Sequence, residues 1–568
     1  MHPRRLVLSV VAAAALAALA LTAAASGSRD KAPANALSKI NHIVVIYEEN
    51  HSFDNLYGGW EGVNGLSKAT AANWTQKDQN GNAIGCLEQL DVNLAAVPST
   101  CSGTDAQGKA FSSAFSNAPF KIDSYIAPSD ATCPAAGVFA ANGLLKGSTG
   151  ALPGGCTRDI VHRFYQEQYQ IDGGKQDRYV SGSDAGGLTM GNYDTKSLPI
   201  YKYLHGKGAP HYAIEDNFFQ SAFGGSFLNH QYLIAAAAPV DNNAADSGLH
   251  SILDANGFPN ATYPFYKPAT AVKDAQLTQA CGQPTTVAGY ACGNYGVNTM
   301  QPTYQPHGGG AILPPQTGQN IGDLLDAKNI DWAWYAGGWS NANGNVNGPG
   351  WTNGSTPGTC TDPNHLSTAV YPNCPDGDFQ FHHQPFNYFA EFDPSTPAGQ
   401  AMRAAHLLDE ASFISTLQSS TKTCGLKPVS FDKPLGEENE HPGYASESVG
   451  SDHLVELIKD FEASACAKDT MFIVTYDEFG GQWDHVPPPS KANPIGPYDQ
   501  FGPGTRIPAL VFAPNLPGNE LVDSAEHDTT SILSTIEHRF GLPPLGTRDM
   551  QVNDLATVYK AKQISSKK

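Results

Sequence analysis

Acidic residues follow two short apolar runs, one near each end of the chain. Glu49 and Asn50 come shortly after the run 43–47, and Asp477 and Glu478 come directly after the run 471–476. Ligands of open α/β sheets collect beyond the carboxyl ends of strands, and carboxylate and amide oxygens suit a hard divalent cation. Each cluster alone is also compatible with a capped turn and solvated acids. Two such clusters favour a metal site, because neighbouring carboxylates raise each other's pKa until a cation balances their charge.

A serine in the middle of the chain is the candidate nucleophile. Gly224 and Gly225 precede Ser226, and the apolar run 232–238 indicates that a helix begins near this serine. A hydroxyl at a helix N-terminus faces free N–H groups and the positive end of the helix dipole, which together attract anions. The same serine could serve only as a helix N-cap. The G-x-S-x-G pattern of ester-cleaving α/β-hydrolases does not occur in the sequence.

Several histidines lie in segments that suit contact with an anion, namely His162, His382, His383 and His441. An imidazole can donate a hydrogen bond to a phosphate oxygen or protonate a leaving group, and a charged imidazole would suit an acidic optimum. Any one of them could equally be structural. Adjacent side chains on a helix point in different directions, so we expect at most one of His382 and His383 to face the site.

A layered scaffold is needed to bring these residues together. The continuous apolar runs 43–47, 471–476 and 509–512 are typical of strands buried on both faces of a sheet. The spacing of apolar residues predicts helices at 452–465 and 196–205. Asp528 is expected to cap a further helix that ends at Gly541. Strands that alternate with helices predict an α/β fold.

Length and composition limit the class of protein. The chain has 568 residues, of which 15% are charged, and its net charge of −20 disfavours non-specific binding to nucleic acid or to an anionic membrane. Length alone would suggest roughly three to four domains. The stretches 58–155 and 239–375 are rich in Gly, Asn, Pro and Ser and hold most of the cysteines. We therefore interpret them as long loops or insertions rather than as separate domains.

The N-terminus predicts export. Arg4 and Arg5 precede an Ala-rich apolar run, so we interpret residues 1–25 as a signal peptide and expect a secreted or periplasmic protein with no later membrane-spanning segment. A retained membrane anchor is the alternative interpretation of this run. Ten cysteines without a CxxC pattern suit disulfides in such a compartment. Their clustering suggests the bridges Cys86–Cys101, Cys133–Cys156, Cys281–Cys292, Cys360–Cys374 and Cys424–Cys466.

Together these motifs resemble the bacterial phosphoesterase family that contains the non-lytic phospholipases C and the AcpA-type acid phosphatases. The segment 42–57 is similar to the opening signature of this family, and residues 475–489 are similar to its late signature. Segments 223–231, 162–170 and 440–443 resemble the acid phosphatase branch, because the phospholipase branch usually has threonine at the nucleophile. The matches run in order from residue 40 to about 545. This favours one catalytic domain at 26–568 over several domains.

The resemblance implies an alkaline phosphatase-like α/β fold, with a three-layer core, a central mixed, mainly parallel sheet and long loop insertions pinned by disulfides. It implies that a divalent metal ion is held by Glu49, Asn50, Asp477 and Glu478, and by Ser226, which would also be the nucleophile. The residues that would contact phosphate are His162, His382 and His441, with His383 and His485 as further candidates.

The function implied is a secreted, metal-dependent phosphoric-ester hydrolase, namely an acid phosphatase that cleaves small phosphomonoesters through a phosphoserine. One alternative is a phospholipase C that cleaves phosphatidylcholine-type phosphodiesters and so binds a phospholipid headgroup. An alternative of another class is a secreted, non-enzymatic binding protein stabilised by calcium. No nucleic-acid partner is expected.

Overall fold

The computed structural model describes the chain in stretches separated by gaps. They comprise residues 36–78, 80–87, 102–104, 110–112, 115–123, 128–129, 160–183, 186–241, 295–345, 359–360, 371–376, 379–442, 445–489, 499 and 501–564. The predicted signal peptide 1–25 lies outside the described residues. The predicted bridges Cys86–Cys101, Cys133–Cys156 and Cys281–Cys292 each include at least one cysteine outside them.

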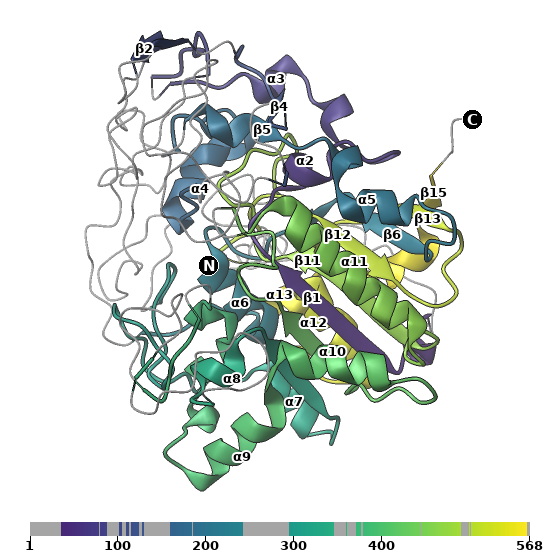
Figure 1. Cartoon of the computed structure of the whole chain (residues 1–568). Helices are drawn as coiled ribbons and strands as arrows, with labels where there is room; N and C mark the ends of the chain where they lie inside the picture. Colours follow the sequence, from purple (N-terminus) through teal and green to yellow (C-terminus); the bar gives the residue numbers. More distant parts are fainter. Residues whose placement is uncertain are drawn as a thin grey trace, which may run out of the picture.

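A sheet of nine strands forms the centre of the described part of the chain (Figure 1). In spatial order its strands are β15 (Lys562–Gln563), β13 (Glu520–Asp523), β6 (Tyr212–Glu215), β12 (Ala509–Phe512), β11 (Thr470–Tyr476), β1 (His42–Glu48), β10 (Val429–Lys433), β8 (Trp332–Ala336) and β9 (Leu407–Asp409). β1 pairs in parallel with both β10 and β11. β12 and β15 pair antiparallel with their neighbours, so the sheet is mixed but mainly parallel.

Helices cover both faces of this sheet. On one face α11 (Glu447–Ala463) packs against α5 (Pro199–Leu204) and α10 (Glu410–Ser419), and on the other α12 (Thr530–Phe540) packs against α6 (Ser226–Ala235) (Figure 1). The side chains of successive strand residues point alternately to the two faces of the sheet. Phe472 of β11 stacks on Phe461 of α11 at 4.5 Å between ring centroids, whereas Tyr47 of β1 contacts His230 of α6 at 4.9 Å. The expected three-layer α/β fold is therefore confirmed.

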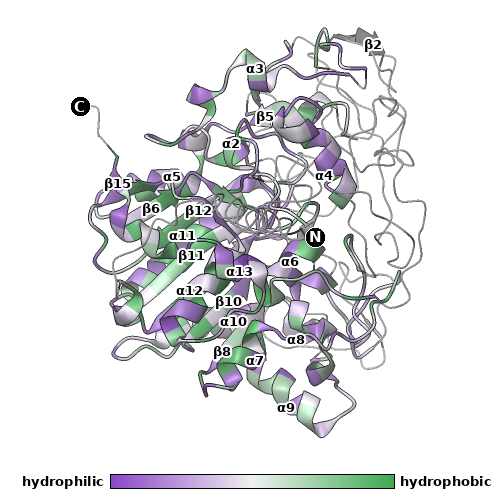
Figure 2. Cartoon of the chain, turned by 180° about the vertical axis from the view of Figure 1, so that it is seen from behind, coloured by the Kyte–Doolittle hydropathy of each residue, from purple (hydrophilic) through white to green (hydrophobic). Residues whose placement is uncertain are grey.

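Shorter elements complete the described part. The helices are α2 (Phe53–Leu56), α3 (Ala71–Trp74), α4 (Phe164–Ile171), α7 (Ile321–Asp326), α8 (Trp339–Ala342), α9 (Pro397–His406) and α13 (Thr547–Gln551). Three small strand pairs are β2 (Ser102–Thr104) with β3 (Ala110–Ser112), β4 (Phe120–Lys121) with β5 (Gly191–Asn192), and β7 (Phe218–Phe219) with β14 (His527–Asp528). The central strands are mainly hydrophobic, whereas the surface helices mix hydrophobic and hydrophilic residues (Figure 2).

The predicted strands are confirmed, because the runs 43–47, 471–476 and 509–512 lie in β1, β11 and β12. These strands are buried along almost their whole length, which explains why their sequences read as continuous apolar runs.

The predicted helices are confirmed with shifted ends. α11 begins at Glu447, before the predicted start at 452, because the Ser446 side chain accepts a hydrogen bond from the Val449 N–H and caps the helix there. The predicted helix 196–205 is shorter, since α5 begins with Pro199 in its first turn. α12 ends at Gly541, whose φ of 64° stops the helix.

The stretch 239–375 contributes to the sheet. It contains β8, whose five residues Trp332–Ala336 are all buried and which pairs in parallel with β10 and β9. Composition alone indicated long loops here. The difference arises because the aromatic strand is short and is flanked by Gly- and Asn-rich sequence that dominates the average composition.

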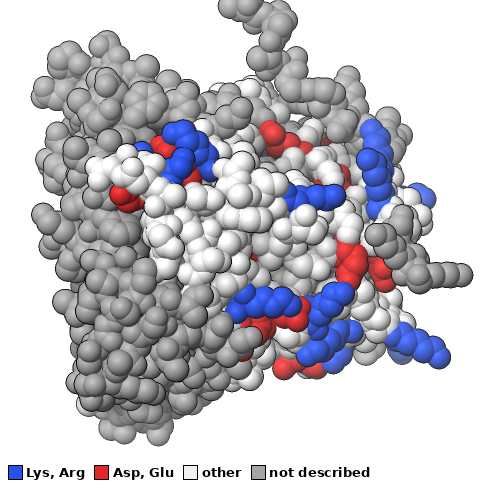
Figure 3. Space-filling model, turned by 90° about the horizontal axis from the view of Figure 1, so that it is seen from above, with Lys and Arg blue, Asp and Glu red and all other residues white. Residues whose placement is uncertain are grey.

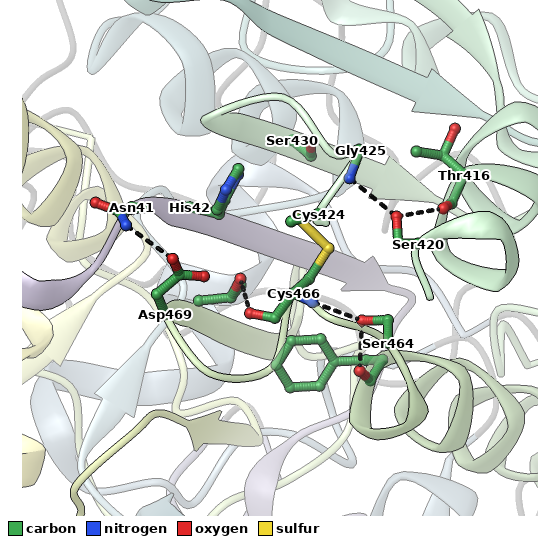
Figure 4. The surroundings of a disulfide bond; sticks show 12 residues. Asn41, His42, Thr416, Ser420, Cys424, Gly425, Ser430, Ser464, Cys466 and Asp469 are labelled. Carbon is green, nitrogen blue, oxygen red and sulfur yellow. Dashed lines mark hydrogen bonds between the residues drawn. A yellow bond between two sulfur atoms is a disulfide. The ribbon is translucent and has the colours of Figure 1, made fainter. Parts of the chain in front are cut away.

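Two predicted disulfides lie within the described residues, and both are confirmed: Cys360–Cys374 and Cys424–Cys466. Cys424–Cys466 joins the segment before β10 to the segment before β11 (Figure 4). Around it, Ser420 Oγ accepts a hydrogen bond from the Gly425 N–H at 2.9 Å, and Ser464 Oγ accepts one from the Cys466 N–H at 3.1 Å. The bridge thus ties the amino ends of two sheet strands together.

Within the described residues, no helix combines the length and the apolar character that crossing a membrane requires. In the view of Figure 3, Lys and Arg side chains lie beside Asp and Glu side chains on the described surface, rather than in a field of one sign.

Candidate active site

Three adjacent parallel strands bring the candidate site together. β11, β1 and β10 end at the same edge of the sheet, with Glu48 of β1 opposite Tyr476 of β11. The residues next along the chain are therefore Glu49 from one strand and Asp477 from its neighbour, while β10 ends at Lys433. Motifs more than 400 residues apart in sequence meet at one place because their strands pair.

The candidate nucleophile lies against the first acidic cluster. Ser226 is the first residue of α6, and its Oγ lies 3.1 Å from Glu49 Oε2 and 3.3 Å from Asn50 Oδ1. Gly224, two residues before Ser226, must be a glycine for two reasons. Its φ is 89°, which favours glycine, and a Cβ at this position would lie 2.6 Å from Phe164 N. The expected helix start at Ser226 is confirmed, with Gly225 rather than the serine as the N-cap residue.

Asn50 connects the two acidic clusters. Its N–H donates a hydrogen bond to Asp477 Oδ1 at 3.2 Å, and its Nδ2 lies 2.8 Å from His441 Nε2. Asn50 has a φ of 58°, a left-handed conformation that asparagine tolerates better than most residues. Gly480 lies so close that a Cβ on it would be 2.3 Å from Asn50 O. The Gly-Gly sequence after Asp477 and Glu478 therefore lets the two loops touch.

The electrostatics of the acids fit a bound cation. Burial, together with the charge of Glu49, raises the pKa of Asp477 well above its usual range, and burial with the charge of Asp477 does the same for Glu478. Among the described residues, Asp477 Oδ2 and Glu478 Oε1 have no hydrogen-bond donor. Buried carboxylate oxygens without donors are costly unless a cation binds them. The donor set of Glu49, Asn50, Asp477 and Glu478 therefore suits a divalent ion, whose identity stays open.

Glu49 differs from its two acidic neighbours. Burial opposes its ionisation, but Lys433 and His383 hold its pKa well below the usual range. Lys433 Nζ lies 2.8 Å from Glu49 Oε1 and is fully buried. The sequence analysis did not identify Lys433. Its place at the end of the buried segment 429–433 was the available signal, but Ser430 and Asp432 interrupt the apolar pattern there.

Three histidines of the site lie near a carboxylate oxygen of the acidic clusters, and a fourth lies against a neighbouring histidine ring. His162 Nε2 lies 3.3 Å from Glu478 Oε1, and His441 Nε2 lies 3.8 Å from Glu49 Oε2. His383 Nε2 lies 2.6 Å from Glu49 Oε1. His382, its neighbour, has its ring 4.8 Å from that of His383. Of this pair, His383 makes the direct contact with Glu49, although the resemblance favoured His382.

The pKa values of the two adjacent histidines are low. Burial lowers the pKa of His383 to about 4, and burial with the neighbouring His383 lowers the pKa of His382 well below its usual range. His383 is therefore neutral near pH 6 with the site as described. The idea that protonated histidines produce an acidic optimum is not supported for His383.

His230 is a second site residue that the sequence analysis missed. It lies one helical turn after Ser226, and its Nδ1 lies 2.8 Å from Ser226 O and 3.6 Å from Asp477 Oδ2. With Glu49 and His383 it forms a buried group whose potential ligand atoms lie within 4.8 Å of one another. The i, i+4 spacing within the helix starting at Ser226 was the signal that could have found it.

His485 belongs to a separate cluster. Its Nδ1 lies 2.5 Å from Asp54 Oδ2, and Arg506 forms ion pairs with both Asp54 and Asp484. These carboxylates have a cationic partner within the protein, so this group is an ion-pair network that holds the late motif against α2. No contact between His485 and Glu49, Ser226 or Asp477 is found among the described residues.

Comparison with known proteins identifies the family of the chain. The chain belongs to the Phosphoesterase family, whose model matches residues 40–543. It is 23% identical over 558 residues to Phospholipase C B of Mycobacterium tuberculosis, covering 92% of this chain and 78% of that protein. It is 29% identical over 180 residues to a non-hemolytic phospholipase C of Burkholderia pseudomallei, covering 27% of this chain and 25% of that protein. The protein is a phosphoric-ester hydrolase.

Solved structures give weaker matches. A protein of the alkaline phosphatase superfamily from Vibrio parahaemolyticus is 14% identical, with a TM-score of 0.23 over 42% of this chain and 50% of that one. The lipoteichoic acid synthase LtaP of Listeria monocytogenes is 11% identical, with a TM-score of 0.23 over 62% and 68%. These overlaps are limited, and the strand order of the chain itself defines the fold.

Proposed function

We propose that the protein is a metal-dependent phosphomonoesterase in which Ser226 is the nucleophile. The observation that carries this proposal is the position of Ser226 Oγ, within 3.3 Å of both Glu49 and Asn50 at the start of a ten-residue helix. A hydroxyl placed among metal-ligating oxygens and free helix N–H groups is positioned to attack an anionic phosphorus centre.

The chain supplies an electrostatic cradle for the phosphoryl group. The free N–H groups of the first turn of α6 can donate to its oxygens, and His382 is a further contact. His162 Nδ1 faces Ile160 O and His441 Nδ1 faces Pro442 O, so the Nε2 atoms of these two rings can donate to phosphate when the imidazoles are protonated. Lys433 is a fixed positive charge beside Glu49. When bound to Glu49, Asn50, Asp477 and Glu478, a divalent cation would lower the pKa of the serine hydroxyl and neutralise phosphoryl charge.

The reaction then takes two steps at phosphorus. The Ser226 hydroxyl releases its proton to solvent as Oγ attacks in line, the bond to the leaving oxygen breaks, and the serine carries the phosphoryl group. The leaving alkoxide takes up a proton, and water then cleaves the phosphoserine to release phosphate and restore the hydroxyl. During both steps the backbone of α6 and the surrounding histidines hold the phosphoryl oxygens.

A second candidate is a phospholipase C that cleaves phosphatidylcholine-type diesters. It is favoured by the match over 92% of the chain to Phospholipase C B. The same serine and acids would serve, with a diacylglycerol as leaving group. The serine, where the phospholipase branch usually has threonine, favours the monoesterase.

The test is a paired assay on wild type and Ser226→Ala. We expect phosphate release from p-nitrophenyl phosphate to exceed phosphocholine release from phosphatidylcholine, and Ser226→Ala to lose at least about 10³-fold in kcat. Ser534→Ala, which alters a buried serine of α12, is the matched control and should keep its activity. Full activity of Ser226→Ala would reject the nucleophile, and the opposite substrate ranking would favour the phospholipase C.

We also propose that the protein is exported with cleavage after Ala25. The basic start and Ala-rich run of residues 1–25 support this. N-terminal sequencing of the protein from culture fluid or periplasm should begin at Ser26, and a sequence beginning at Met1 would contradict it.

A further inference from the structure

Away from the site above, a second group of buried acids gathers at the other half of the sheet. Glu215 is the last residue of β6 and Asp523 is the last residue of β13, and the two strands pair in parallel with Glu215 directly opposite Asp523. His527 lies four residues further on, in β14, which pairs with β7. The antiparallel strand β12 separates β6 from β11, so this group lies at a different part of the sheet from Asp477.

The Glu215 carboxylate has no partner for its charge. The side chain is fully buried, and neither of its oxygens has a hydrogen-bond donor among the described residues. No lysine or arginine of the described part forms an ion pair with Glu215 or Asp523. The cluster of Asp54 and Asp484 differs, because Arg506 neutralises it. Burial, with the nearby charges of Asp523 and Asp216, raises the pKa of Glu215 well above its usual range.

Asp523 faces the same space. Its Oδ1 accepts a hydrogen bond from the Ala525 N–H at 3.0 Å, which leaves Oδ2 directed toward His527. Burial opposes its ionisation, but contacts with His527 and Thr557 lower the pKa of Asp523. At least one full negative charge therefore lies beside Glu215 in the interior.

The orientation of His527 completes the group. Its Nδ1 lies 3.3 Å from Asn553 O, a carbonyl that can only accept, so we place the ring hydrogen on Nδ1. Nε2 then presents its lone pair toward a space that it shares with Thr557 Oγ1 at 2.9 Å, Glu215 Oε2 at 3.6 Å and Asp523 Oδ2 at 4.0 Å. A backbone carbonyl on the second ring nitrogen is the usual way in which a protein orients a metal-binding histidine.

The separations between these atoms suit a shared ion better than direct contact. A hydrogen-bonded ion pair would bring the nitrogen to about 2.7–3.0 Å from the oxygen. Two ligands of one ion, each about 2.0–2.4 Å from it, lie about 3–4 Å apart. Distances of 3.6 and 4.0 Å fall in the second range, and the potential ligand atoms of all three residues lie within 4.8 Å of one another.

We propose that Glu215, Asp523 and His527 bind a second divalent cation with a structural role. Two carboxylates and one imidazole suit an ion of intermediate softness, such as Zn²⁺ or Mn²⁺. The ion would tie β6 to the C-terminal segment 523–527, and through β14 to the start of α12. The inference is independent of the proposed reaction, since none of the three residues contacts Ser226 or the first acidic clusters among the described residues.

The experiment measures metal content rather than turnover. The protein and its variants are loaded with Zn²⁺ or Mn²⁺, dialysed against buffer without chelator and analysed by elemental analysis. We expect Glu215→Gln and His527→Gln each to hold one equivalent less than wild type and to show a lower Tm, which added metal raises less than it raises the Tm of wild type. Glu537→Gln is the matched control, because Glu537 is also buried and adjacent to an aspartate but has no histidine in its group.

A titration of a protein in which Glu215 and His527 are intact decides the case in which the variants above fail to fold. Asp477→Asn removes a ligand of the first site, so calorimetric titration of this protein with Zn²⁺ and with Mn²⁺ should show one remaining site. The double variant Asp477→Asn, Glu215→Gln should show none. Absence of any site in Asp477→Asn, or equal metal content in wild type and Glu215→Gln, would overturn the proposal and leave the group as a proton-sharing acid pair beside His527.

Discussion

Lys433 Nζ lies 2.8 Å from Glu49 Oε1, and both side chains are fully buried. They come from the ends of two neighbouring parallel strands, β10 and β1. The ammonium also donates a hydrogen bond to Tyr47 O at 2.8 Å, which fixes its position. This contact explains why Glu49 stays ionised while the pKa values of Asp477 and Glu478 rise. One carboxylate of the site is thus ready to ligate a cation before any cation arrives.

The first prediction removes this ammonium. In the metal-free protein we expect Lys433→Met to lower the free energy of unfolding by about 3–5 kcal/mol at pH 7, because Glu49 is left buried without its partner. A carboxylate whose folded pKa is depressed stabilises the protein above its unfolded pKa, and that contribution is lost as pH falls through the folded pKa. The difference from wild type should therefore shrink toward pH 3 in urea denaturation.

Lys427→Met is the control for loss of a lysine. Lys427 Nζ lies 2.7 Å from the exposed Asp331 at the protein surface, so its removal should cost less than about 1 kcal/mol at any pH. Equal losses in the two variants would contradict the role given to Lys433.

The second prediction concerns Asp477 as a metal ligand. We expect Asp477→Asn to lose most of the metal at the first site in elemental analysis, because one of the oxygens without a donor is replaced by an amide. The metal-free variant should be no less stable than metal-free wild type, since the change also removes repulsion from Glu49. Unchanged metal content would count against this ligand, and a large loss of metal-free stability would mean that the carboxylate is structural.

Much of the fold follows from buried strands that are visible as apolar runs. β1, β11 and β12 were predictable because both faces of each strand are covered, so every position is apolar. β8 and β10 were not predicted. β10 carries Ser430, Asp432 and Lys433 inside the protein, and these polar residues interrupt the pattern that identifies a strand.

In the candidate site, too, some residues could be predicted from local sequence and others could not. Acids that follow recognisable strands, and the serine after two glycines, could be proposed because a local pattern marks them. The place of Lys433 in the site depends on which strands become neighbours, and that of His230 depends on which face of α6 packs on the sheet. Local sequence determines neither arrangement. Which of His382 and His383 contacts Glu49 could not be predicted for the same reason, since it depends on how a short 3₁₀ turn is oriented.

The third prediction concerns Cys424–Cys466. This bridge closes a loop of 42 residues, so we expect Cys424→Ala with Cys466→Ala to lower the free energy of unfolding by about 4 kcal/mol, on the chain-entropy estimate. Hydrolysis of phosphoric esters at 25 °C should remain, because the bridge lies at the opposite end of the strands from the site. The bridge Cys360–Cys374 closes a loop of 14 residues, so replacing both of its cysteines by alanine should lower the free energy of unfolding by about 3 kcal/mol. Loss of activity before loss of folding would show that the bridge also positions the site.

The last prediction uses Glu440, which precedes His441 and accepts a hydrogen bond from the Tyr476 hydroxyl. Burial raises the pKa of Glu440 from 4.5 to about 8. The folded state therefore binds an extra proton between these pH values, and its stability falls as pH rises from 4.5 to 8, by about 5 kcal/mol at most. Glu440→Gln removes this proton uptake. In urea denaturation of the metal-free protein the variant should gain stability relative to wild type from pH 5 to pH 8, whereas Glu456→Gln, on the exposed surface of α11, should follow wild type. A constant difference between Glu440→Gln and wild type across this range would show that Glu440 is already ionised.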